Sequence, residues 1–422
     1  MDDGKRKGKA VVVGGSIAGI SCAHALIKAG WEVVVIEKSS GPPTGSPTGA
    51  GLGLDPLSQK LIESWLGHPN LLHTSTLPLS IDQNQSTDGE NNMSQTLTRD
   101  ENYNFRAAHW SDLHSLLYNA LLPTDIFLWG HLYLTFCIGN DKSKVRVKSQ
   151  VLATGEIVEI VGDLLIAADG CLSSIRRNFL PELKLRYSGY IAYRGVLDFS
   201  DDEHSEAITG IRRAYPELGK CLYFNLACRT HSVLFELLKK KFNWIWYVNQ
   251  PEPRLQGNSV TMKVSSEMIK KMHEDAEKVW DSEFVRIIKE TKEPFVNVIY
   301  DCDPLQQLVW DNVVLVGEAA HPITPHGSRS TNMAILDAAV LGKCLDKWGV
   351  ENLRLALGEF QTIRLPVISE QVLHSRKMGQ IKQGLVLPNG KAFDPKMVSP
   401  EECLDLQMKN MPFFGEIPSI LE

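Results

Sequence analysis

The sequence lacks the patterns that mark several other classes of protein. Its eight cysteines form no C-x-x-C pair and fit no zinc-ligand spacing, so we interpret them as scattered thiols in a reducing compartment. The net charge of −6 disfavours a basic face for nucleic acid or an anionic membrane. No run reaches the about 20 apolar residues of a membrane span. We find no Walker loop, metal-ligand cluster or Ser-His-Asp order, and we expect no metal and a cytoplasmic location.

What is present is the composition of an ordinary globular protein, with 43% apolar and 22% charged residues in a chain of 422. That length predicts two or three domains, or one compound unit. Residues 9–13 are predicted to form a buried strand, 17–29 a helix ended by Gly30, and 32–37 a second strand. The basic start and the apolar residues after it also resemble a secretory signal. The glycine-rich turn inside them favours a nucleotide-binding βαβ unit instead.

The rest of the chain changes character several times. We expect a long loop at 39–53, a polar loop or hairpin at 81–104, a helix at 106–121, strands within 143–168, and a separate antiparallel sheet at 185–262. Further on we expect a charged helical segment at 266–291, a buried strand at 313–316 and a helix at 331–348. The C-terminal part carries helix-like and loop-like pieces that the pattern does not place.

The first motif is a glycine-rich turn between strand and helix. It reads Gly14-Gly15-Ser16-Ile17-Ala18-Gly19 and follows G-x-G-x-x-G, except that Ser16 stands at the second glycine. Gly14 permits the tight turn, residue 16 lets the backbone approach a pyrophosphate, and Gly19 lets the helix pack close to the strand. The helix N-terminus offers free N–H groups to phosphates. Glu37, followed by Lys38, ends the second strand and suits a ribose 2′-hydroxyl, as in FAD or NAD rather than NADP.

Two later stretches add to this motif. Residues 162–176 place Asp169-Gly170 at a strand end, with Ser173 and Arg176 on the following turn. Residues 317–338 begin with Gly317-Glu318 after a buried strand and continue through a Pro/Gly loop into a helix. With these three motifs in order, residues 9–345 resemble the class A flavoprotein monooxygenases, the aromatic-hydroxylase superfamily. Residues 190–195 and 242–247 look closest to its dihydroxypyridine-hydroxylase-like branch.

The resemblance implies non-covalent FAD, with NAD(P)H and O2 as co-substrates, and it assigns roles by position. Glu37 would hold the adenosine ribose, Arg106 would contact the flavin phosphate or ribityl region, and Glu318 would bond a ribityl hydroxyl. The remaining residues expected to bind the cofactor are Gly14, Gly15, Ser16, Ile17, Ala18, Gly19, Lys38, Gly51, Asp169, Gly170, Arg176, Gly317, Pro325, Gly327, Arg329, Ser330, Thr331 and Asn332. Two of these positions depart from the family, which usually has Asp where Glu318 stands and often Gly where Ser330 stands.

The residues that would contact the substrate are less clear. His326 and Tyr193 are candidates for a direct part in the chemistry, which belongs mainly to the flavin. Tyr223, Trp246 and Pro325 are candidates for the substrate pocket, although aromatic residues on a sheet are more often plain core. Strand alternation puts Trp246 on one face and its neighbours on the other, so only one set can face a ligand. Arg329 could bind a substrate anion or could equally be a surface loop charge.

The predicted fold is mixed α/β, with a Rossmann-like FAD-binding domain, an inserted antiparallel β-sheet substrate domain and C-terminal helices. The FAD-binding domain is expected from residues 1–75, 105–180 and 295–390, the substrate domain from 76–104 and 181–294, and a tail at 391–422. The resemblance implies that FAD reduced by NAD(P)H reacts with O2, and that a flavin hydroperoxide hydroxylates an aromatic or N-heteroaromatic small molecule. Three alternatives stay open: an epoxidase or N-oxidising monooxygenase, a flavin oxidase or reductase, and a non-catalytic flavin-binding regulator. One chain, as monomer or homodimer, should suffice without a separate reductase.

Overall fold

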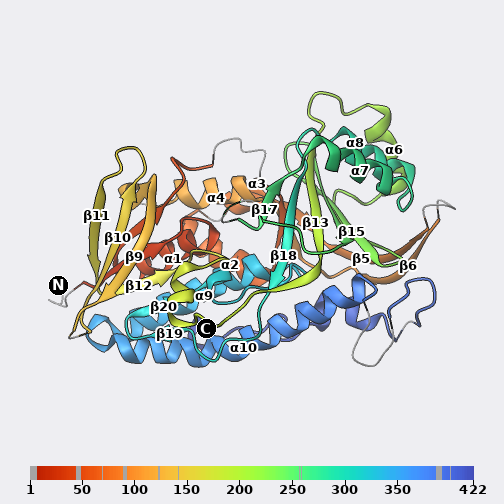
Figure 1. Cartoon of the computed structure of the whole chain (residues 1–422). Coiled ribbons are helices and arrows are strands. Elements are labelled where there is room, and N and C mark those ends of the chain that lie inside the picture. The colour runs from red at the N-terminus through yellow and green to blue at the C-terminus, as the bar shows by residue number, and fades with distance from the viewer. Residues whose placement is uncertain are drawn as a thin grey trace.

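Two large sheets lie side by side and share one long helix beneath them (Figure 1). The computed structural model describes residues 7–43, 49–68, 70–88, 93–121, 124–140, 142–255, 257, 259–385, 392–399 and 401–422. The first sheet has six strands in the order β19 (Val309–Trp310), β20 (Val313–Leu315), β12 (Leu164–Ala167), β1 (Lys9–Val13), β2 (Glu32–Glu37) and β8 (Phe127–Trp129). All of its neighbouring strands are parallel except β19 and β20. This is the βαβ arrangement that the first motif predicts.

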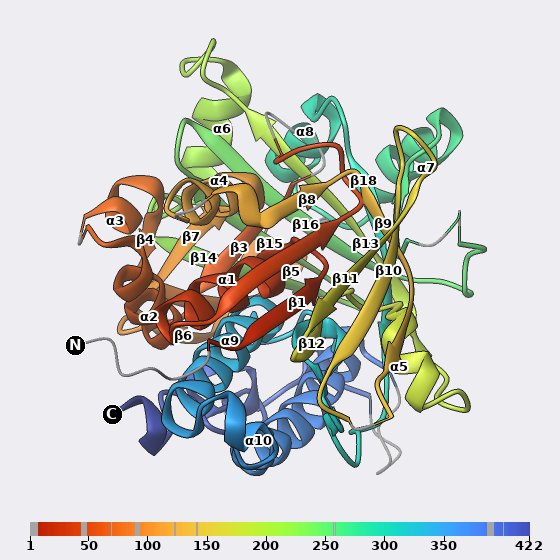
Figure 2. The ribbon, with the colours of Figure 1, turned by 90° about the vertical axis from the view of Figure 1, so that its left-hand side faces the viewer.

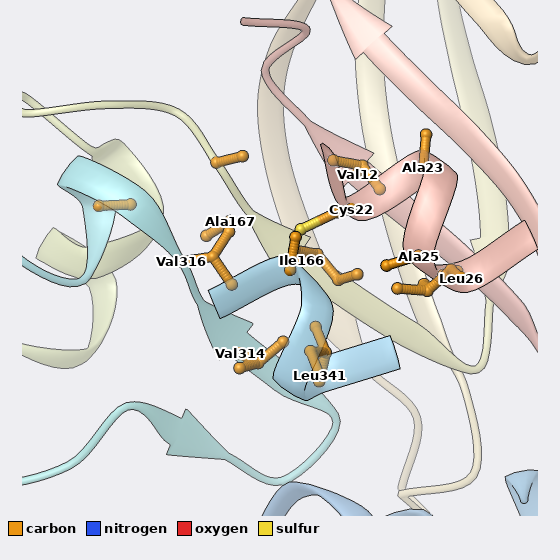
Figure 3. Close-up of a cluster of buried hydrophobic side chains, with 14 of the residues drawn as sticks. Val12, Cys22, Ala23, Ala25, Leu26, Ile166, Ala167, Val314, Val316 and Leu341 are labelled. Atoms are coloured by element: carbon orange, nitrogen blue, oxygen red, sulfur yellow. The ribbon is translucent and has the colours of Figure 1, made fainter. Parts of the chain in front are cut away.

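Both faces of the six-stranded sheet are covered. On one face α1 (Ile17–Lys28) packs against α9 (Arg329–Trp348), so closely that a Cβ at Gly342 would lie 2.8 Å from that of Ala25. Figure 3 shows the side chains that meet there, with those of α1 and α9 against Val12, Ile166 and Val314 of the sheet. On the other face lies a three-stranded antiparallel sheet, β9 (His131–Ile138), β10 (Val145–Val151) and β11 (Ile157–Gly162) (Figure 2).

The second large sheet has eight strands. Their order is β17 (Thr261–Lys263), β18 (Phe295–Asp301), β13 (Arg186–Asp198), β16 (Lys241–Asn249), β15 (Thr230–Leu237), β14 (Cys221–Ala227), β5 (Ile81–Asp88) and β6 (Met93–Asp100). Its outer face packs on α6 (Glu206–Ala214), α7 (Ser266–Ala276) and α8 (Ser282–Glu290), which bury one set of alternating side chains. The opposite set, which includes Ala192, Phe224 and Tyr247, faces the rest of the molecule.

Shorter elements join these layers. They are a three-stranded sheet of β3 (Gly51–Leu54), β7 (Phe105–His109) and β4 (Leu77–Leu79), the helices α2 (Pro56–Leu66), α3 (Leu71–Ser75), α4 (Trp110–Asn119) and α5 (Ser174–Phe179), and the 3-10 turns η1 (Thr124–Ile126), η2 (Gly317–Ala319), η3 (Val350–Asn352), η4 (Leu404–Leu406), η5 (Met408–Asn410) and η6 (Ser419–Leu421). The long helix α10 (Leu353–Lys382) starts against α9 and ends under the eight-stranded sheet, where Met378 and Ile381 join its core (Figure 1). No helix in the described ranges is long and apolar enough to cross a bilayer.

The mixed α/β fold is confirmed, and most of the expected elements are present. The helix expected at 106–121 is wrong at its start, because residues 105–109 form β7, which pairs with β3 and β4. The charged segment 266–291 is two helices, because α7 ends at Ala276 and Asp281 caps the start of α8. The stretch 81–104 is the hairpin of β5 and β6, apart from residues 89–92, and the loop expected at 39–53 contains the start of β3; residues 89–92 and 44–48 lie outside the described residues. The domain boundaries stay a prediction.

Candidate functional site

A cavity of about 300 Å³ lies at the carboxyl end of β1, β2 and β12; we call it the polar cavity after the charged side chains in its wall, such as Glu37 and Asp169. It is lined by residues of the glycine-rich turn, the end of β2, the start of β9 and the segment after β12. Those expected from the sequence to bind the cofactor are Gly14, Ser16, Glu37, Lys38, Asp169 and Gly170. The structure therefore brings the first two motifs together around one space, as ligand sites in open parallel sheets require.

The glycine-rich turn has the geometry of an anion site. Gly14 has φ +103°, and a Cβ there would lie 2.3 Å from the carbonyl oxygen of Ala168. A Cβ at Gly19 would lie 1.8 Å from the oxygen of Gly14, so only glycine lets α1 start this close to β1. Ser16 is exposed at the N-cap and makes no side-chain hydrogen bond to the helix. The first N–H groups of α1 are thus left for a ligand.

Glu37 and Asp169 both hold backbone as well as lining the cavity. The Glu37 carboxylate accepts hydrogen bonds from the N–H of Gly15 at 2.7 Å and of Ser39 at 2.9 Å, which fixes the turn and the end of β2. Asp169 accepts from the N–H of Ser174 at 2.8 Å and so fixes the start of α5. Both carboxylates are therefore preorganised at the cavity wall.

A middle cavity of about 380 Å³ continues from the polar cavity, and Ser16, Ala168 and Gly170 line both. Ile17, Ala18 and Glu318 also line it, together with Pro325, Ser330 and Thr331 from the loop before α9 and its first turn. Glu318 accepts a hydrogen bond from the Ser330 hydroxyl at 2.8 Å. The two residues that depart from the family pattern, Glu318 and Ser330, therefore contact each other. The serine hydroxyl holds the carboxylate of the longer glutamate side chain by this hydrogen bond.

A cavity of about 400 Å³ lies beyond the middle one; we call it the apolar cavity after the side chains that the eight-stranded sheet contributes to it. The two spaces adjoin, because Arg194, Tyr247, Glu318, Pro325, Ser330 and Thr331 are among the residues that line both. Gly51 and Gly53 of β3 form one wall, and the inner face of the eight-stranded sheet forms another. The apolar side chains are Leu79, Leu222, Phe224, Val233, Phe235, Ile245 and Phe295. A volume of this size suits a ring system surrounded by hydrophobic side chains.

The start of α9 is a second helix end without a side-chain cap. Ser328 stands at the N-cap with φ +54° and makes no hydrogen bond to the helix from its side chain. Asn332 is buried and donates to the carbonyls of Ser328 and Gly53 at 2.6 and 2.9 Å, which ties the loop to β3. The first turn of α9 thus points its free N–H groups toward the middle and apolar cavities, where Ser330 and Thr331 lie.

A fully buried polar cluster holds the 317–321 turn. Asp337 of α9 accepts hydrogen bonds from Gly317 N at 2.9 Å, His321 Nε2 at 2.7 Å and Arg364 Nε at 2.8 Å. Burial would raise the pKa of Asp337, but the charges of Arg364 and His321 outweigh it and lower the pKa to about 2. Because Glu318 lies inside this turn, the cluster positions a cavity residue without touching the cavity itself.

Several expected site residues lie elsewhere. Arg176 is buried and donates to the backbone carbonyls of Glu318 and Ala319 at 3.1 and 2.9 Å, which joins the second and third motifs behind the cavities. Arg106 donates to the backbone and hydroxyl of Thr76 rather than facing any of the three cavities. Arg329 is not a surface charge: it is 4% exposed and pairs with Asp55 at 2.6 Å. Gly327 has φ +87° and lies near Met411 of the C-terminal segment.

Three aromatic residues expected at the site point away from the cavities. Tyr193, Tyr223 and Trp246 belong to the outer face of the eight-stranded sheet, in the core under α6, α7 and α8. Tyr193 packs on Trp246 with ring centroids 6.0 Å apart. These expectations are corrected because side chains alternate along a strand. The inner face carries Arg194 and Tyr247 instead, whereas Pro325 and His326 do line the apolar cavity.

Sequence reasoning missed several cavity residues, among them Trp110, Arg194 and Tyr247, which line both the middle and apolar cavities. Arg194 donates to the side chain of Asn297 and the carbonyl of Gly51, both at 3.2 Å. Both of these partners are neutral, and burial lowers the pKa of the guanidinium. The signal that could have identified Arg194 is its position as a charged residue within an aromatic strand. A buried cation needs a polar or charged partner, so such a residue often marks a site.

The residues of this channel fit FAD. The fit rests on three observations: a row of three adjoining cavities, two helix starts without side-chain caps along it, and glycines where a Cβ would collide with backbone. Two carboxylates along this row, Glu37 in the polar cavity and Glu318 in the middle one, can accept from ribose and ribityl hydroxyls. The polar end suits the adenosine part and the wider end suits a flat ring system.

Comparisons with known proteins agree with this geometry. Residues 7–189 match the model of the FAD binding domain family. The chain is 26% identical over 380 residues to the aurachin C monooxygenase/isomerase of Stigmatella aurantiaca, covering 88% of this chain and 89% of that one. It is 26% identical over 363 residues to the 6-hydroxynicotinate 3-monooxygenase of Pseudomonas fluorescens, covering 84% of this chain and 86% of that one. The solved 2,6-dihydroxypyridine-3-hydroxylase from Arthrobacter nicotinovorans superposes with a TM-score of 0.77 at 21% identity, covering 98% and 99%.

Proposed function

We propose that this chain, whose residues 7–189 match an FAD-binding domain and which is similar along most of its length to FAD-dependent monooxygenases, is itself such an enzyme. It would use NAD(P)H and O2 to place one oxygen atom on an aromatic or N-heteroaromatic ring held in the apolar cavity. The observation that carries the proposal is the channel formed by the three adjoining cavities. Its polar end suits a dinucleotide, and its far end is an apolar space large enough for a separate ring.

The residues proposed to hold FAD are those that line the channel. The start of α1 would bind the pyrophosphate, Glu37 the ribose, and Glu318 the ribityl chain. The start of α9 would place its positive end beside the flavin ring. When bound, FAD supplies the redox chemistry, since it accepts hydride from NAD(P)H and activates O2.

The protein's own contribution is to orient the ring and exclude water. The apolar side chains of the inner sheet face, among them Leu222 and Val233, would hold the ring by burial. Arg194 and Tyr247 stand at the junction of the two cavities, between the space proposed for the flavin and the space proposed for the substrate. Because the hydrogen-bond partners of Arg194 are neutral, the guanidinium can stabilise an oxyanion on the substrate.

One chain would suffice for the whole reaction. The glycine-rich turn is the single complete dinucleotide fingerprint in the sequence, and FAD would occupy it. NAD(P)H would then dock transiently near Asp169 and the flavin edge, without a separate reductase. We propose a cytoplasmic enzyme that works as a monomer or homodimer.

The test begins with the purified protein, which should be yellow and should release FAD, rather than FMN, on acid or heat treatment. NAD(P)H consumption is then measured against a panel of phenols, pyridines, purines, indoles and terpenoids. The expected product carries one labelled oxygen when 18O2 is supplied. Peroxide formed in proportion to NAD(P)H, with no oxygenated product from any ring, would identify an oxidase and refute the proposal. A flavin that NAD(P)H never bleaches would indicate a regulator.

A further inference from the structure

A buried histidine outside the three sequence motifs holds the glycine-rich turn from behind. His114 of α4 is 1% exposed and lines none of the three cavities. Its Nε2 lies 2.8 Å from the carbonyl oxygen of Gly15. A carbonyl oxygen only accepts hydrogen bonds, so Nε2 carries the proton and donates to Gly15. The other ring nitrogen, Nδ1, is buried and has no hydrogen-bond partner among the described residues.

Aromatic side chains hold the ring of His114 in place. Trp110 and Tyr118 lie one helical turn before and after it on α4, with ring centroids 5.6 and 6.4 Å from that of His114. Trp129 of β8 packs on the same ring at 6.4 Å, and its indole N–H donates to the Tyr118 hydroxyl at 3.3 Å. Burial lowers the pKa of His114 below its ordinary value. The imidazole is therefore neutral at neutral pH and keeps its proton on Nε2.

Both polar groups of the Gly15 backbone have a side-chain partner. The N–H donates to Glu37 Oε2 at 2.7 Å, and the carbonyl accepts from His114. A Cβ at Gly15 would lie 3.0 Å from the Cβ of Glu37 and from the ring of Phe127, so the backbone fits closely at this point. Side chains from β2, α4 and β8 together set the position of this residue.

The bond to His114 also sets the direction of the next N–H group. A peptide unit is planar and trans, so the N–H of Ser16 points opposite to the carbonyl of Gly15. That carbonyl points toward His114, which lies outside the cavity walls, whereas Ser16 lines the polar and middle cavities. The N–H of Ser16 therefore points away from His114, at the start of α1 where a phosphate would bind.

We infer that His114 is a positioning residue for the pyrophosphate of FAD. By holding the carbonyl of Gly15, it keeps the N–H of Ser16 directed into the cavities before the cofactor binds. Without this bond the peptide unit between the two residues can rotate, and FAD must order it on binding, which lowers the affinity. The inference rests on the FAD site of the proposed function and adds a residue that touches neither cofactor nor substrate.

The experiment measures FAD binding to the apoprotein by flavin fluorescence and records the 31P spectrum of the pyrophosphate in the reconstituted holoprotein. His114→Phe keeps a ring between Trp110 and Tyr118 but removes the donor. Its dissociation constant for FAD should rise about tenfold, because the buried carbonyl of Gly15 loses its partner, and its 31P signals should move. His114→Gln, whose amide N–H can donate to the same carbonyl, should return the 31P signals toward the wild-type positions and the affinity to within about threefold.

The matched control is His24→Phe. His24 is also buried and bonds a backbone carbonyl, that of Leu117, at 2.8 Å, but this bond lies away from the turn. An equal rise in the dissociation constant for both variants would show a general effect of losing a buried bond and would overturn the inference. An unchanged dissociation constant with unchanged 31P signals in His114→Phe, folded as judged by its melting temperature, would also refute it.

A crystal structure of the wild-type holoprotein provides a test that needs no variant. Nε2 of His114 should remain within hydrogen-bonding distance of the Gly15 oxygen, and the Ser16 N–H should donate to a pyrophosphate oxygen. A Ser16 N–H directed away from the pyrophosphate would contradict the positioning role.

These outcomes are separate from those of the proposed function, because FAD binding and the 31P spectrum do not depend on oxygen transfer. If a ring gains labelled oxygen but His114→Phe binds FAD as the wild type does, the positioning role is refuted and the monooxygenase proposal stands. If His114→Phe binds FAD weakly and no ring gains labelled oxygen, the positioning role stands and the monooxygenase proposal is refuted.

Discussion

Replacing Asp337 by Asn should destabilise the fold strongly without touching a cavity residue. The change keeps the shape of the side chain but removes the negative charge beside Arg364, which is 0% exposed. Removing one partner from a buried ion pair costs about 3–5 kcal/mol, a large part of the about 5–15 kcal/mol of a typical protein. The variant should also bind FAD more weakly, because Asp337 holds the turn that contains Glu318.

The assay is urea unfolding of apoprotein and holoprotein, followed by tryptophan fluorescence and by flavin fluorescence. The matched control is Asp405→Asn, because the Asp405–Lys377 pair is 2.6 Å long and 54% exposed on both sides. That pair should contribute at most about 1 kcal/mol. A loss of less than about 1 kcal/mol for Asp337→Asn would refute the reasoning, since it would mean that Arg364 finds other compensation.

The pH dependence of the same residue has a definite sign. The pKa of Asp337 is lowered from its usual 3.8 to about 2, so its stabilisation is complete above pH 3.8 and is lost as the pH falls toward 2. The shift of roughly two pKa units corresponds to about 2–3 kcal/mol. Acid unfolding of the wild type should therefore show a contribution in this range that Asp337→Asn lacks, and identical pH profiles would contradict it.

Three further predictions follow from the channel. Glu37→Ala should raise the dissociation constant of FAD about tenfold to a hundredfold, whereas Glu32→Ala on the exposed start of the same strand should not change it; equal effects would make Glu37 an ordinary surface charge. Tyr247→Leu should raise the KM for substrate about tenfold, because an aromatic contact is worth about 0.5–1.5 kcal/mol beyond its area, while Tyr193→Phe on the opposite face should leave KM unchanged; the reverse result would invalidate the assignment of sheet faces. Stopped-flow reduction without oxygen should be faster with substrate bound, and equal rates would argue against substrate gating.

The sequence predicts the parts of the site that depend on local backbone chemistry. The turn at Gly14 and the Asp169-Gly170 segment both follow a buried parallel strand, and the structure places them around one cavity. The sequence does not say which face of a strand lies under helices, since alternation defines two sets of side chains and not their neighbours. Tyr193 was therefore expected at the site, although Arg194 lies there. The strand before α4 was missed for a related reason, because its partners β3 and β4 are distant in sequence.

Other residues have roles that differ from the expected ones, because their partners in the fold could not be predicted from the sequence. Arg329 could be judged only by its loop, and its partner Asp55 lies far away in the chain. Arg176 was expected to bind the cofactor from its motif, yet its guanidinium satisfies carbonyls of the third motif. His231 belongs to no motif, and its contact with the side chain of Gln383 becomes visible only when β15 and the end of α10 are placed together.

The position of β20 in the six-stranded sheet also governs how the protein is made. This strand, Val313–Leu315, pairs with β12, Leu164–Ala167, and the whole eight-stranded sheet apart from the β5–β6 hairpin is encoded between them. During synthesis the six-stranded sheet therefore keeps β12 as an unpaired edge strand until the strands of the eight-stranded sheet have emerged from the ribosome. Contacts this distant in sequence form slowly, and an open apolar edge can pair with other chains. Early binding of FAD at the completed turn between β1 and α1 would stabilise the waiting segment, so the supply of cofactor should raise the yield of folded protein.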